Sequence, residues 1–502
     1  MDNKTKGYFI AALIAIIGAL GVLLSQLQED DPIITSSTTS SSTSMPSTSS
    51  MSSSTSVALA PIDFYGAKNQ TILFRFVLSE DKCINGIVGL NFPYKIFQAG
   101  TVITKYKSFK GATVGDYEDP MYEVNGLPCK AGNYYAEIKI PLDANNGVHS
   151  FNFNDDAFSL YVFNFYVPTV ASLPTLIEMT SQYAWNAHYG LLNPLPWSKQ
   201  QPITDLYAQA LVDHRMNPYK HYMSSREDYV RHSMDTSPSY VVLPINGYTY
   251  QTSYSDFTDA KLATAEKLAK EAIAKGIIPL IYLFDEPSTY IISNSIPTLV
   301  SLVKAKVPSA KVMITTKFNQ SLSDLGVDFF NPVAQHYTGK EKMFYVSCMS
   351  HGCGNYEGDS GEPDLSIDRD NEAYVRSIYW LAFKNDQTAV LYYNSVEFYK
   401  RSTPNPFTEA LWIGGGSNGG GWDFSGNGDG TLFYPDYANE KPIASKRLKA
   451  LRTGSYDYEY LKLAKEKGIS INNPVTDWKV WSKNIIDYEK EIIRLGLLIE
   501  KE

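Results

Sequence analysis

The chain has 502 residues and a formal net charge of −9, from 44 Lys and Arg against 53 Asp and Glu. At roughly 100–200 residues per domain, we expect more than one domain. The acidic balance argues against a nucleic-acid-binding protein, which needs a basic face for phosphates. Hydrophobic residues make up 44% of the chain, and 36 Tyr and 23 Phe argue against disorder throughout. Four Cys are too few for a disulfide-dense scaffold, although an even number suits two disulfides outside the cell.

The N-terminal residues have the pattern of a membrane anchor. Two lysines precede an apolar run within residues 8–25, and three acidic residues follow it at 29–31. The run is at the short end of what a bilayer requires, and the flanking charges place the N-terminus in the cytoplasm. We therefore predict cytoplasmic residues 1–7 and a single transmembrane helix over 8–25. A cleaved secretory signal is the rival, but no small-x-small site follows the run. Cleavage after Lys6-Gly7 would instead make the segment resemble a prepilin-type leader.

Residues 26–58 have the composition of a solvated linker. Nearly every residue from Thr35 to Ser56 is Ser or Thr, so this tract cannot form a core. Two sequons for N-glycosylation follow, at Asn69 and Asn319. We expect a glycoprotein in the cell membrane whose folded part is extracellular.

Residues 59–170 have the pattern of a β domain. Segments that alternate apolar and polar residues are separated by Gly, Pro and Asn, which favours a β-sandwich. Cys83 and Cys129 both fall in this region and are expected to form one disulfide. The clearest predicted strands are Thr71–Val77, Tyr134–Ile140 and Phe158–Tyr166.

Residues 171–470 have an α/β pattern. Apolar strands alternate with helical patterns such as Asp259–Lys275, which predicts a (β/α)8 barrel. No dinucleotide or P-loop motif is present, so we expect no cofactor. Residues 471–502 are predicted to form a C-terminal helical segment. The eight candidate strands are Thr175–Met179, Met216–Tyr219, Ser239–Pro244, Ile277–Phe284, Lys311–Thr316, Val327–Pro332, Met343–Ser347 and Thr388–Tyr393.

Two adjacent acids mark the end of one predicted strand. Asp285 and Glu286 directly follow Ile277–Phe284, and strand ends of this kind face the active site in a barrel. A carboxyl group against an apolar wall can act as a general acid near neutral pH. The alternative is that Asp285 caps the next helix. Neighbours on a strand point to opposite faces, so both acids reach one pocket only if the strand ends or bulges here.

Several segments resemble the family 123 glycoside hydrolases and their DUF4091 relatives. The strongest is the C-terminal pair Gly428–Pro435 and Ser445–Leu461; Leu211–Pro218 and Gly132–Glu137 resemble earlier segments of that family. The resemblance covers most of residues 60–470. It implies a β-sandwich followed by a (β/α)8-like catalytic domain.

The resemblance also implies an activity. Family 123 enzymes are retaining β-N-acetylgalactosaminidases in which the acetamido group of the substrate replaces the enzymic nucleophile. Carried over, Glu286 is the general acid/base and Asp285 holds the acetamido N–H. One acidic motif of the family is shortened here, over Arg452–Tyr458. We interpret its Arg452 and Asp457 as a structural ion pair on a helix.

Other residues are weaker candidates for substrate binding. Trp412 and Trp422 suit stacking on sugar rings, whereas Trp380 is expected in the core. A tyrosine on the acetamido carbonyl is expected of such enzymes, and Tyr337 is one candidate. The remaining candidates lie after predicted strands and are His336, Tyr392, Tyr393 and Asn394.

No metal site is predicted. Cys348 and Cys353 lack further ligands nearby, so a small disulfide loop is favoured over a metal. The glycine-rich run over residues 414–430 lacks the spacing of a calcium loop. We interpret that run as a mobile loop over the barrel mouth.

Three hypotheses follow. The first is a membrane-anchored extracellular glycosidase that acts on glycans containing N-acetylhexosamine, with Asp285 and Glu286 as the catalytic pair and no nucleic-acid partner. The second is a glycan-binding or cell-envelope surface protein with the same fold and no turnover. The third is a conventional two-carboxylate hydrolase with Glu397 as the nucleophile.

Overall fold

The computed structural model describes residues 62–105, 107–153, 156–179, 197–220, 227–236, 239–243, 257–347, 358–396, 407 and 426–502. Residues 61–502 form one compact unit, and the domain boundaries expected within it stay predictions. The predicted anchor and linker lie outside the described residues. Within the described ranges, every helix is too short or too polar to cross a membrane.

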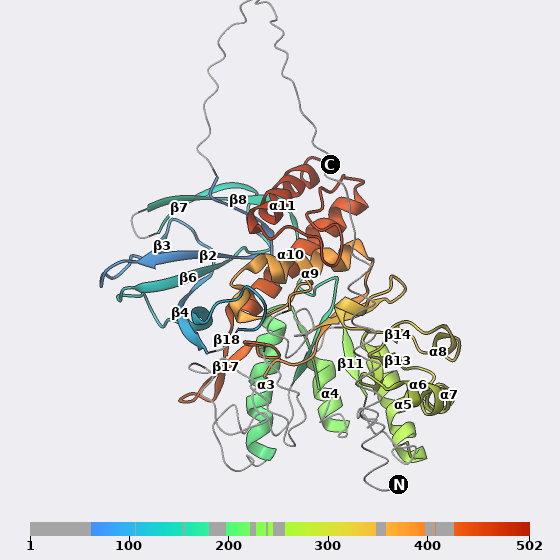
Figure 1. Ribbon diagram of the computed structural model, residues 1–502. Coiled ribbons are helices and arrows are strands. Elements are labelled where there is room, and N and C mark those ends of the chain that lie inside the picture. The colour runs from blue at the N-terminus through green and yellow to red at the C-terminus, as the bar shows by residue number, and fades with distance from the viewer. Residues whose placement is uncertain are drawn as a thin grey trace, which may run out of the picture. The chain divides into compact units, whose positions relative to one another are not determined.

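The N-terminal part of this unit consists of two four-stranded sheets (Figure 1). One has the order β1-β8-β7-β3 and the other β2-β6-β4-β5. A single core between them draws on both sheets, with Ile72 and Ile138 from one and Phe151 and Leu160 from the other. The disulfide between Cys83 and Cys129 is confirmed. The strands are β1 Phe64–Lys68, β2 Thr71–Leu78, β3 Ile87–Val88, β4 Tyr94–Thr104, β5 Gly115–Glu123, β6 Gly132–Lys139, β7 Gly147–Phe153 and β8 Asp156–Tyr166.

All eight strands predicted for the α/β part are present. They form two parallel sheets, with the orders β10-β9-β16-β15 and β11-β12-β13-β14. Strand β10 lies beside β11, and a bridge between Val333 and Tyr345 joins the end of β14 to β15. These strands are β9 Thr175–Met179, β10 Asn217–Lys220, β11 Tyr240–Val242, β12 Ile278–Phe284, β13 Lys311–Ile314, β14 Phe329–Phe330, β15 Met343–Val346 and β16 Ala389–Tyr392. A further pair, β17 Phe433–Asp436 and β18 Lys441–Ala444, is antiparallel.

Each parallel sheet has two differently packed faces. One cluster of buried side chains has members on or next to all eight strands, including Leu176, Tyr219, Tyr282 and Tyr345. We call this set the interior cluster. The opposite faces pack against helices, as Leu283 does with the helices that follow β11 and β12.

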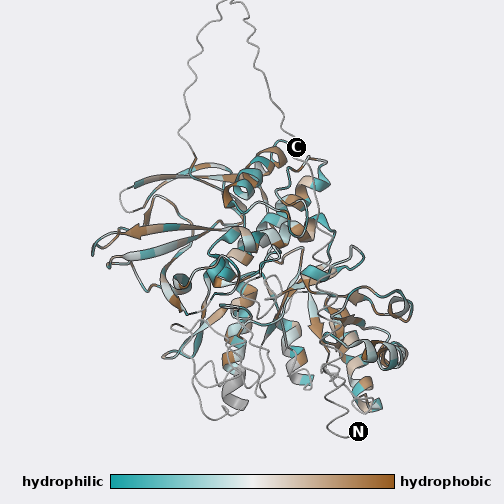
Figure 2. Ribbon diagram, in the orientation of Figure 1, coloured by the Kyte–Doolittle hydropathy of each residue, from teal (hydrophilic) through white to brown (hydrophobic). Residues whose placement is uncertain are grey.

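Hydrophobic and hydrophilic residues are interspersed along the helices in Figure 2. Helix α5 shows the predicted apolar face, with Leu262, Ala265, Leu268 and Ala272 buried, and begins at an N-cap hydroxyl from Thr258. The helices and 3-10 turns are α3 Trp197–Asp213, α4 Glu227–Thr236, α5 Asp259–Ala274, α6 Thr289–Asn294, α7 Ile296–Lys306, α8 Gln320–Asp324, η2 Ala334–His336, η4 Ile367–Arg369, α9 Glu372–Lys384, α10 Lys446–Glu466 and α11 Ile485–Ile499.

Helix α10 corrects one expectation about charged residues. It packs against α9 and α11, and Arg452 and Asp457 are both buried in it (Figure 1). They do not pair with each other: Arg452 bonds Glu137 of β6, and Asp457 bonds Arg376 of α9. Five residues along a helix separate the two side chains by about 140°, so each faces a different neighbour. The burial of Trp380 in α9 is confirmed.

The glycine-rich run is also corrected where it is described. Asn427 and Asp429 are buried, and the Asn427 side chain bonds Asp368 at 2.8 Å. A Cβ at Gly428 would meet Ile367 and Arg447 at under 3.0 Å, and its φ is +74°. This end of the run is therefore part of the packed interior, because glycine allows both the turn and the close approach.

Candidate active site

A register shift in β12 decides where the two acids point. Tyr282 pairs with Met313 and Phe284 with Ile314, so one extra residue is inserted between the two pairs. Tyr282 belongs to the interior cluster, whereas Leu283 and Phe284 both pack on the helix side. The inserted residue reverses the alternation, and Asp285 follows on the same side as Tyr282. The strand also ends at Phe284. The strand therefore both bulges and ends at this point, and these are the two alternatives under which the sequence allowed both acids to reach one pocket.

Two hydroxyl groups hold the Asp285 carboxylate. Tyr282 donates to Oδ1 of Asp285 at 3.0 Å, and Thr315 donates to the same oxygen at 2.9 Å. Neither bond uses Oδ2. Burial raises the pKa of Asp285 above its ordinary value, and the nearby Glu286 raises it too, whereas both hydroxyls oppose the rise.

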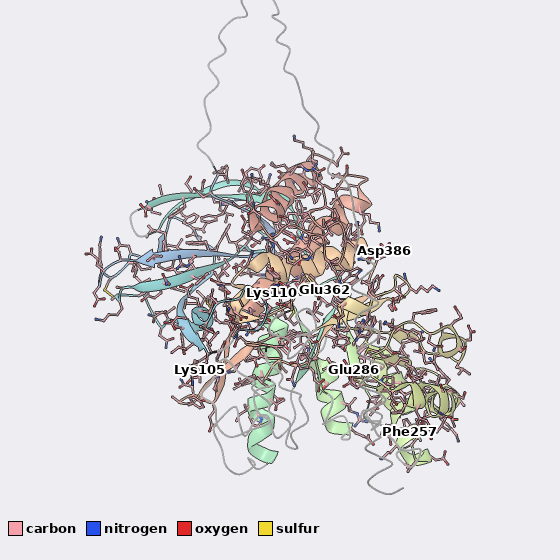
Figure 3. The ribbon with its side chains drawn as sticks, in the orientation of Figure 1. Lys105, Lys110, Phe257, Glu286, Glu362 and Asp386 are labelled. Carbon is pink, nitrogen blue, oxygen red and sulfur yellow. A yellow bond between two sulfur atoms is a disulfide. The ribbon has the colours of Figure 1, made fainter. Side chains whose placement is uncertain are left out.

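The backbone of Glu286 departs from the extended conformation of β12. Its φ is +40°, which is uncommon for a residue other than glycine, and its side chain is exposed. The backbone N–H donates to the Thr315 hydroxyl at 2.6 Å, and the Tyr345 hydroxyl bonds Oε1 of Glu286. Figure 3 shows Glu286 in the part of the view where Figure 1 places β11 and α4. A solvent-accessible carboxyl group with one oxygen held by a phenol is suited to proton transfer.

A third carboxylate shares this interior. Glu178 on β9 is buried and lies opposite Tyr219 of β10 in the strand register. The Tyr219 hydroxyl approaches Oε2 of Glu178 at 3.4 Å, and burial, together with the charges of Glu178 and Asp285, raises the Tyr219 pKa. The sequence analysis missed Glu178. Alternation within Thr175–Met179 was the available signal, because Glu178 shares a strand face with Leu176.

The three residues predicted at the end of β16 have different surroundings. Tyr392 belongs to a helix-side core, and its hydroxyl accepts the N–H of Gly430 at 2.6 Å. Tyr393 packs against the interior cluster and donates to Oδ2 of Asp429 at 3.0 Å. The Asn394 side chain accepts backbone N–H groups of the next two residues and so shapes a turn. Of the three, Tyr393 lies nearest to the interior cluster.

The structure places Tyr337 and His336 away from the acids. Gln387 donates to the Tyr337 hydroxyl at 2.9 Å, and the Tyr337 ring packs on Trp478. Gln387 lies two residues before β16, so Tyr337 lies at the N-terminal ends of the strands, whereas the acids follow the C-terminal end of β12. His336 is exposed at the end of η2. The tyrosines that bond the pair are Tyr282, on Asp285, and Tyr345, on Glu286, and the sequence analysis singled out neither as a site residue.

Five other residues singled out from the sequence cannot be placed. Trp412, Trp422, Cys348, Cys353 and Glu397 lie outside the described residues.

The two sequons differ in geometry. The Asn69 side-chain amide donates to Val167 O at 3.0 Å and to the Thr169 hydroxyl at 3.1 Å, whereas Asn319 caps α8 through its oxygen. Glycosylation of Asn69 would remove one of its two amide hydrogens, so it would cost a bond of the folded state. Glycosylation of either residue stays a prediction.

Comparison with known proteins places this fold. No protein-family model matches the chain, and no curated protein sequence matches it significantly. Among solved structures, a family 123 glycoside hydrolase from Clostridium perfringens, studied for glycolipid glycan hydrolysis, is similar with a TM-score of 0.57 and 11% identity, over 87% of this chain and 92% of that chain.

Two other glycosidases match more weakly. A GH5 xyloglucanase from Bacteroides ovatus has a TM-score of 0.28 and 7% identity, over 78% of this chain and 98% of that chain. A β-glucuronidase from Bacteroides uniformis has a TM-score of 0.26 and 10% identity, over 80% and 48%. Both scores are too low to establish a common fold. The predicted resemblance is confirmed for the fold: the chain has the architecture of a family 123 glycoside hydrolase.

Proposed function

We propose that this protein is a glycoside hydrolase, a retaining β-N-acetylhexosaminidase of the β-N-acetylgalactosaminidase type. The observation that carries the proposal is the inserted residue in β12, which brings Asp285 to the interior face next to the exposed Glu286. The similar fold of the Clostridium perfringens enzyme supports it. In the same proposal, the two parallel sheets are the halves of one (β/α)8 barrel, and the pair lies at its mouth.

Glu286 would act as the general acid. The Tyr345 hydroxyl occupies Oε1, which leaves Oε2 to carry the proton toward the leaving glycosidic oxygen. As the C–O bond breaks, the acetamido oxygen of the substrate bonds to the anomeric carbon. The Glu286 carboxylate then accepts a proton from water, which attacks the same carbon and opens the acetamido ring. The anomeric configuration is retained after the two displacements.

Asp285 would hold the acetamido group. Its Oδ2 is the oxygen that the two hydroxyls do not use, so it can accept the acetamido N–H. A charged carboxylate there stabilises the positive charge that develops on the acetamido ring. The two hydroxyl donors favour the charged form and oppose the effect of burial.

The N-terminal sequence pattern supports a location for this enzyme at the cell surface. In this proposal the helix over residues 8–25 anchors the chain in the cell membrane, and the Ser/Thr-rich linker holds the enzyme outside. The substrate would be a glycan that contains N-acetylhexosamine.

Hydrolysis of two chromogenic substrates tests the activity. Wild type and Glu286→Gln are compared on p-nitrophenyl β-N-acetylgalactosaminide and β-N-acetylglucosaminide. We expect hydrolysis by the wild type and a loss of at least about a hundredfold in the variant, because the base that activates water in the second step is missing. Equal rates in both proteins would contradict the role of Glu286. No hydrolysis by either, with saturable binding of the sugar, would favour a non-catalytic glycan-binding protein.

A further inference from the structure

Asn331 is a buried polar residue directly after β14. That strand lies between β13, which Thr315 follows, and β15, which carries Tyr345, and these two side chains bond the acids. The Asn331 backbone N–H bonds Ile314 O at 3.0 Å, which continues the pairing of β14 with β13 and places Asn331 opposite Thr315. Phe329 and Val333, two residues to either side, pack in the interior cluster. By alternation the Asn331 side chain faces the same interior.

Within the part of the chain that the structure describes, the Asn331 side-chain amide has no hydrogen-bond partner. The residue is 0% exposed, and neither Oδ1 nor Nδ2 forms a hydrogen bond. An amide carries two donors and two acceptor positions, and buried polar groups are almost always satisfied by protein or by ordered water. An internal ligand with both donor and acceptor capacity is therefore expected at this position.

The Thr315 hydroxyl has an unused acceptor position close to the Asn331 amide in the strand register. Its oxygen accepts the Glu286 N–H, and its single hydrogen is donated to Asp285 Oδ1 at 2.9 Å, with Phe284 O a more distant acceptor at 3.4 Å. A hydroxyl oxygen has two lone pairs, so one acceptor position is unused by these bonds. Asn331 has unused donors on the neighbouring strand, at the same level of the register.

We propose that Asn331 is a positioning residue that binds an internal water molecule, and that this water donates to the Thr315 hydroxyl. The Asn331 side-chain amide donates an Nδ2–H to the water oxygen, and the water donates to the last acceptor position of Thr315. The Thr315 hydrogen is then fixed toward Asp285, and the Thr315 oxygen toward the Glu286 N–H. Asn331 thus acts on the acids through Thr315 and does not touch the substrate.

The test is Asn331→Leu, which keeps the shape of the side chain and removes its polar atoms. We expect Tm to fall by about 2 °C or more, because a satisfied amide is lost together with its water. The inference rests on the proposed function for a second readout, the pH profile of kcat/KM. With Thr315 less well fixed, the charged form of Asp285 loses stabilisation, so the acidic limb moves to higher pH.

Thr204→Val is the matched control. Among the described residues, the Thr204 hydroxyl on α3 is also buried without a partner, but it bonds neither Thr315 nor the acids, so Thr204→Val should leave the pH profile of kcat/KM unchanged. A second variant, Asn331→Ser, keeps a donor and leaves room for water, so it should recover the wild-type pH profile.

An unchanged or raised Tm in Asn331→Leu would overturn the inference, since the amide would then be idle. A lower Tm with an unmoved pH profile would overturn the positioning role. If the wild type hydrolyses neither substrate, the proposed function fails on its own, and the Tm comparison still decides whether Asn331 holds a ligand.

Discussion

Asp285 and Glu286 are joined through a single hydroxyl group. Thr315 donates to Asp285 Oδ1 at 2.9 Å and accepts the backbone N–H of Glu286 at 2.6 Å. The first bond stabilises the charged carboxylate, and the second supports the unusual positive φ of Glu286. One side chain directly after β13 therefore acts on the electrostatics of one acid and on the orientation of the other.

Replacing Thr315 with Val should impair both acids at once. The variant keeps the shape and loses the donor to Asp285, so the pKa of Asp285 rises further above its ordinary value. We expect kcat/KM to fall about tenfold and its acidic limb to move to higher pH, because the charged form then appears only at higher pH. Thr316→Val is the control, since Thr316 is the next residue and its side chain forms no hydrogen bond to either acid among the described residues. An acidic limb at the wild-type pH in Thr315→Val would contradict this role.

Replacing Tyr345 with Phe should separate two candidate tyrosines. Tyr345 bonds Glu286, whereas Tyr337 bonds Gln387 at the other ends of the strands. We expect Tyr345→Phe to lower kcat by about tenfold or more, because the carboxyl group loses its fixed orientation. Tyr337→Phe should retain most of the wild-type kcat. The reverse order of the two effects would show that Tyr337 is the tyrosine of the site.

Much of the fold could be predicted because its strands are fully buried. Eight short apolar segments bounded by turn residues were each found within two or three residues of their predicted limits. The face of α5 followed from its period in the same way. Local patterns of this kind depend on burial alone, and burial is visible in a single sequence.

The details of the site depend on contacts between strands, which no local pattern encodes. The inserted residue before Asp285 is seen only when β12 is paired with β13. Tyr345 is one aromatic residue among many until the ends of β12 and β15 are brought together. The partners of Arg452 and Asp457 likewise come from distant elements, which is why the expected pair was wrong.

A buried histidine should make stability depend on pH. Burial, aided by the charges of Arg452 and Lys449, lowers the pKa of His214 to about 3, and Glu137 only partly opposes this. The unfolded chain binds a proton at His214 near pH 6.5, whereas the folded chain does not until about pH 3. The free energy of unfolding should therefore fall as pH decreases from 6.5 toward 3.

Urea unfolding at pH 4, 5, 6 and 7 measures this dependence. His214→Gln should reduce the slope between pH 4 and 6 by about 1.4 kcal/mol per pH unit, the value for one proton. The variant's overall stability can differ without affecting the comparison, because only the slope is diagnostic. Equal slopes in the two proteins would show that His214 does not titrate as its burial implies.

The acetamido group of the substrate should be essential. If it supplies the nucleophile, p-nitrophenyl β-galactoside should react about a thousandfold more slowly than its N-acetylated counterpart, because the intramolecular attack is lost. The buried Glu178 provides the contrasting case, as a third carboxylate on the interior face with Tyr219 between it and Asp285.

A conventional retaining glycosidase places its nucleophile about 5–5.5 Å from the acid. In that case Glu178→Gln would abolish hydrolysis of both substrates, and a 2-deoxy-2-fluoro glycoside would label Glu178 covalently. Under the acetamido mechanism the same variant retains measurable activity on the N-acetylated substrate, and no label forms on the protein. Mass spectrometry of the treated enzyme, together with the two rates, therefore distinguishes a nucleophile carried by the substrate from one carried by β9.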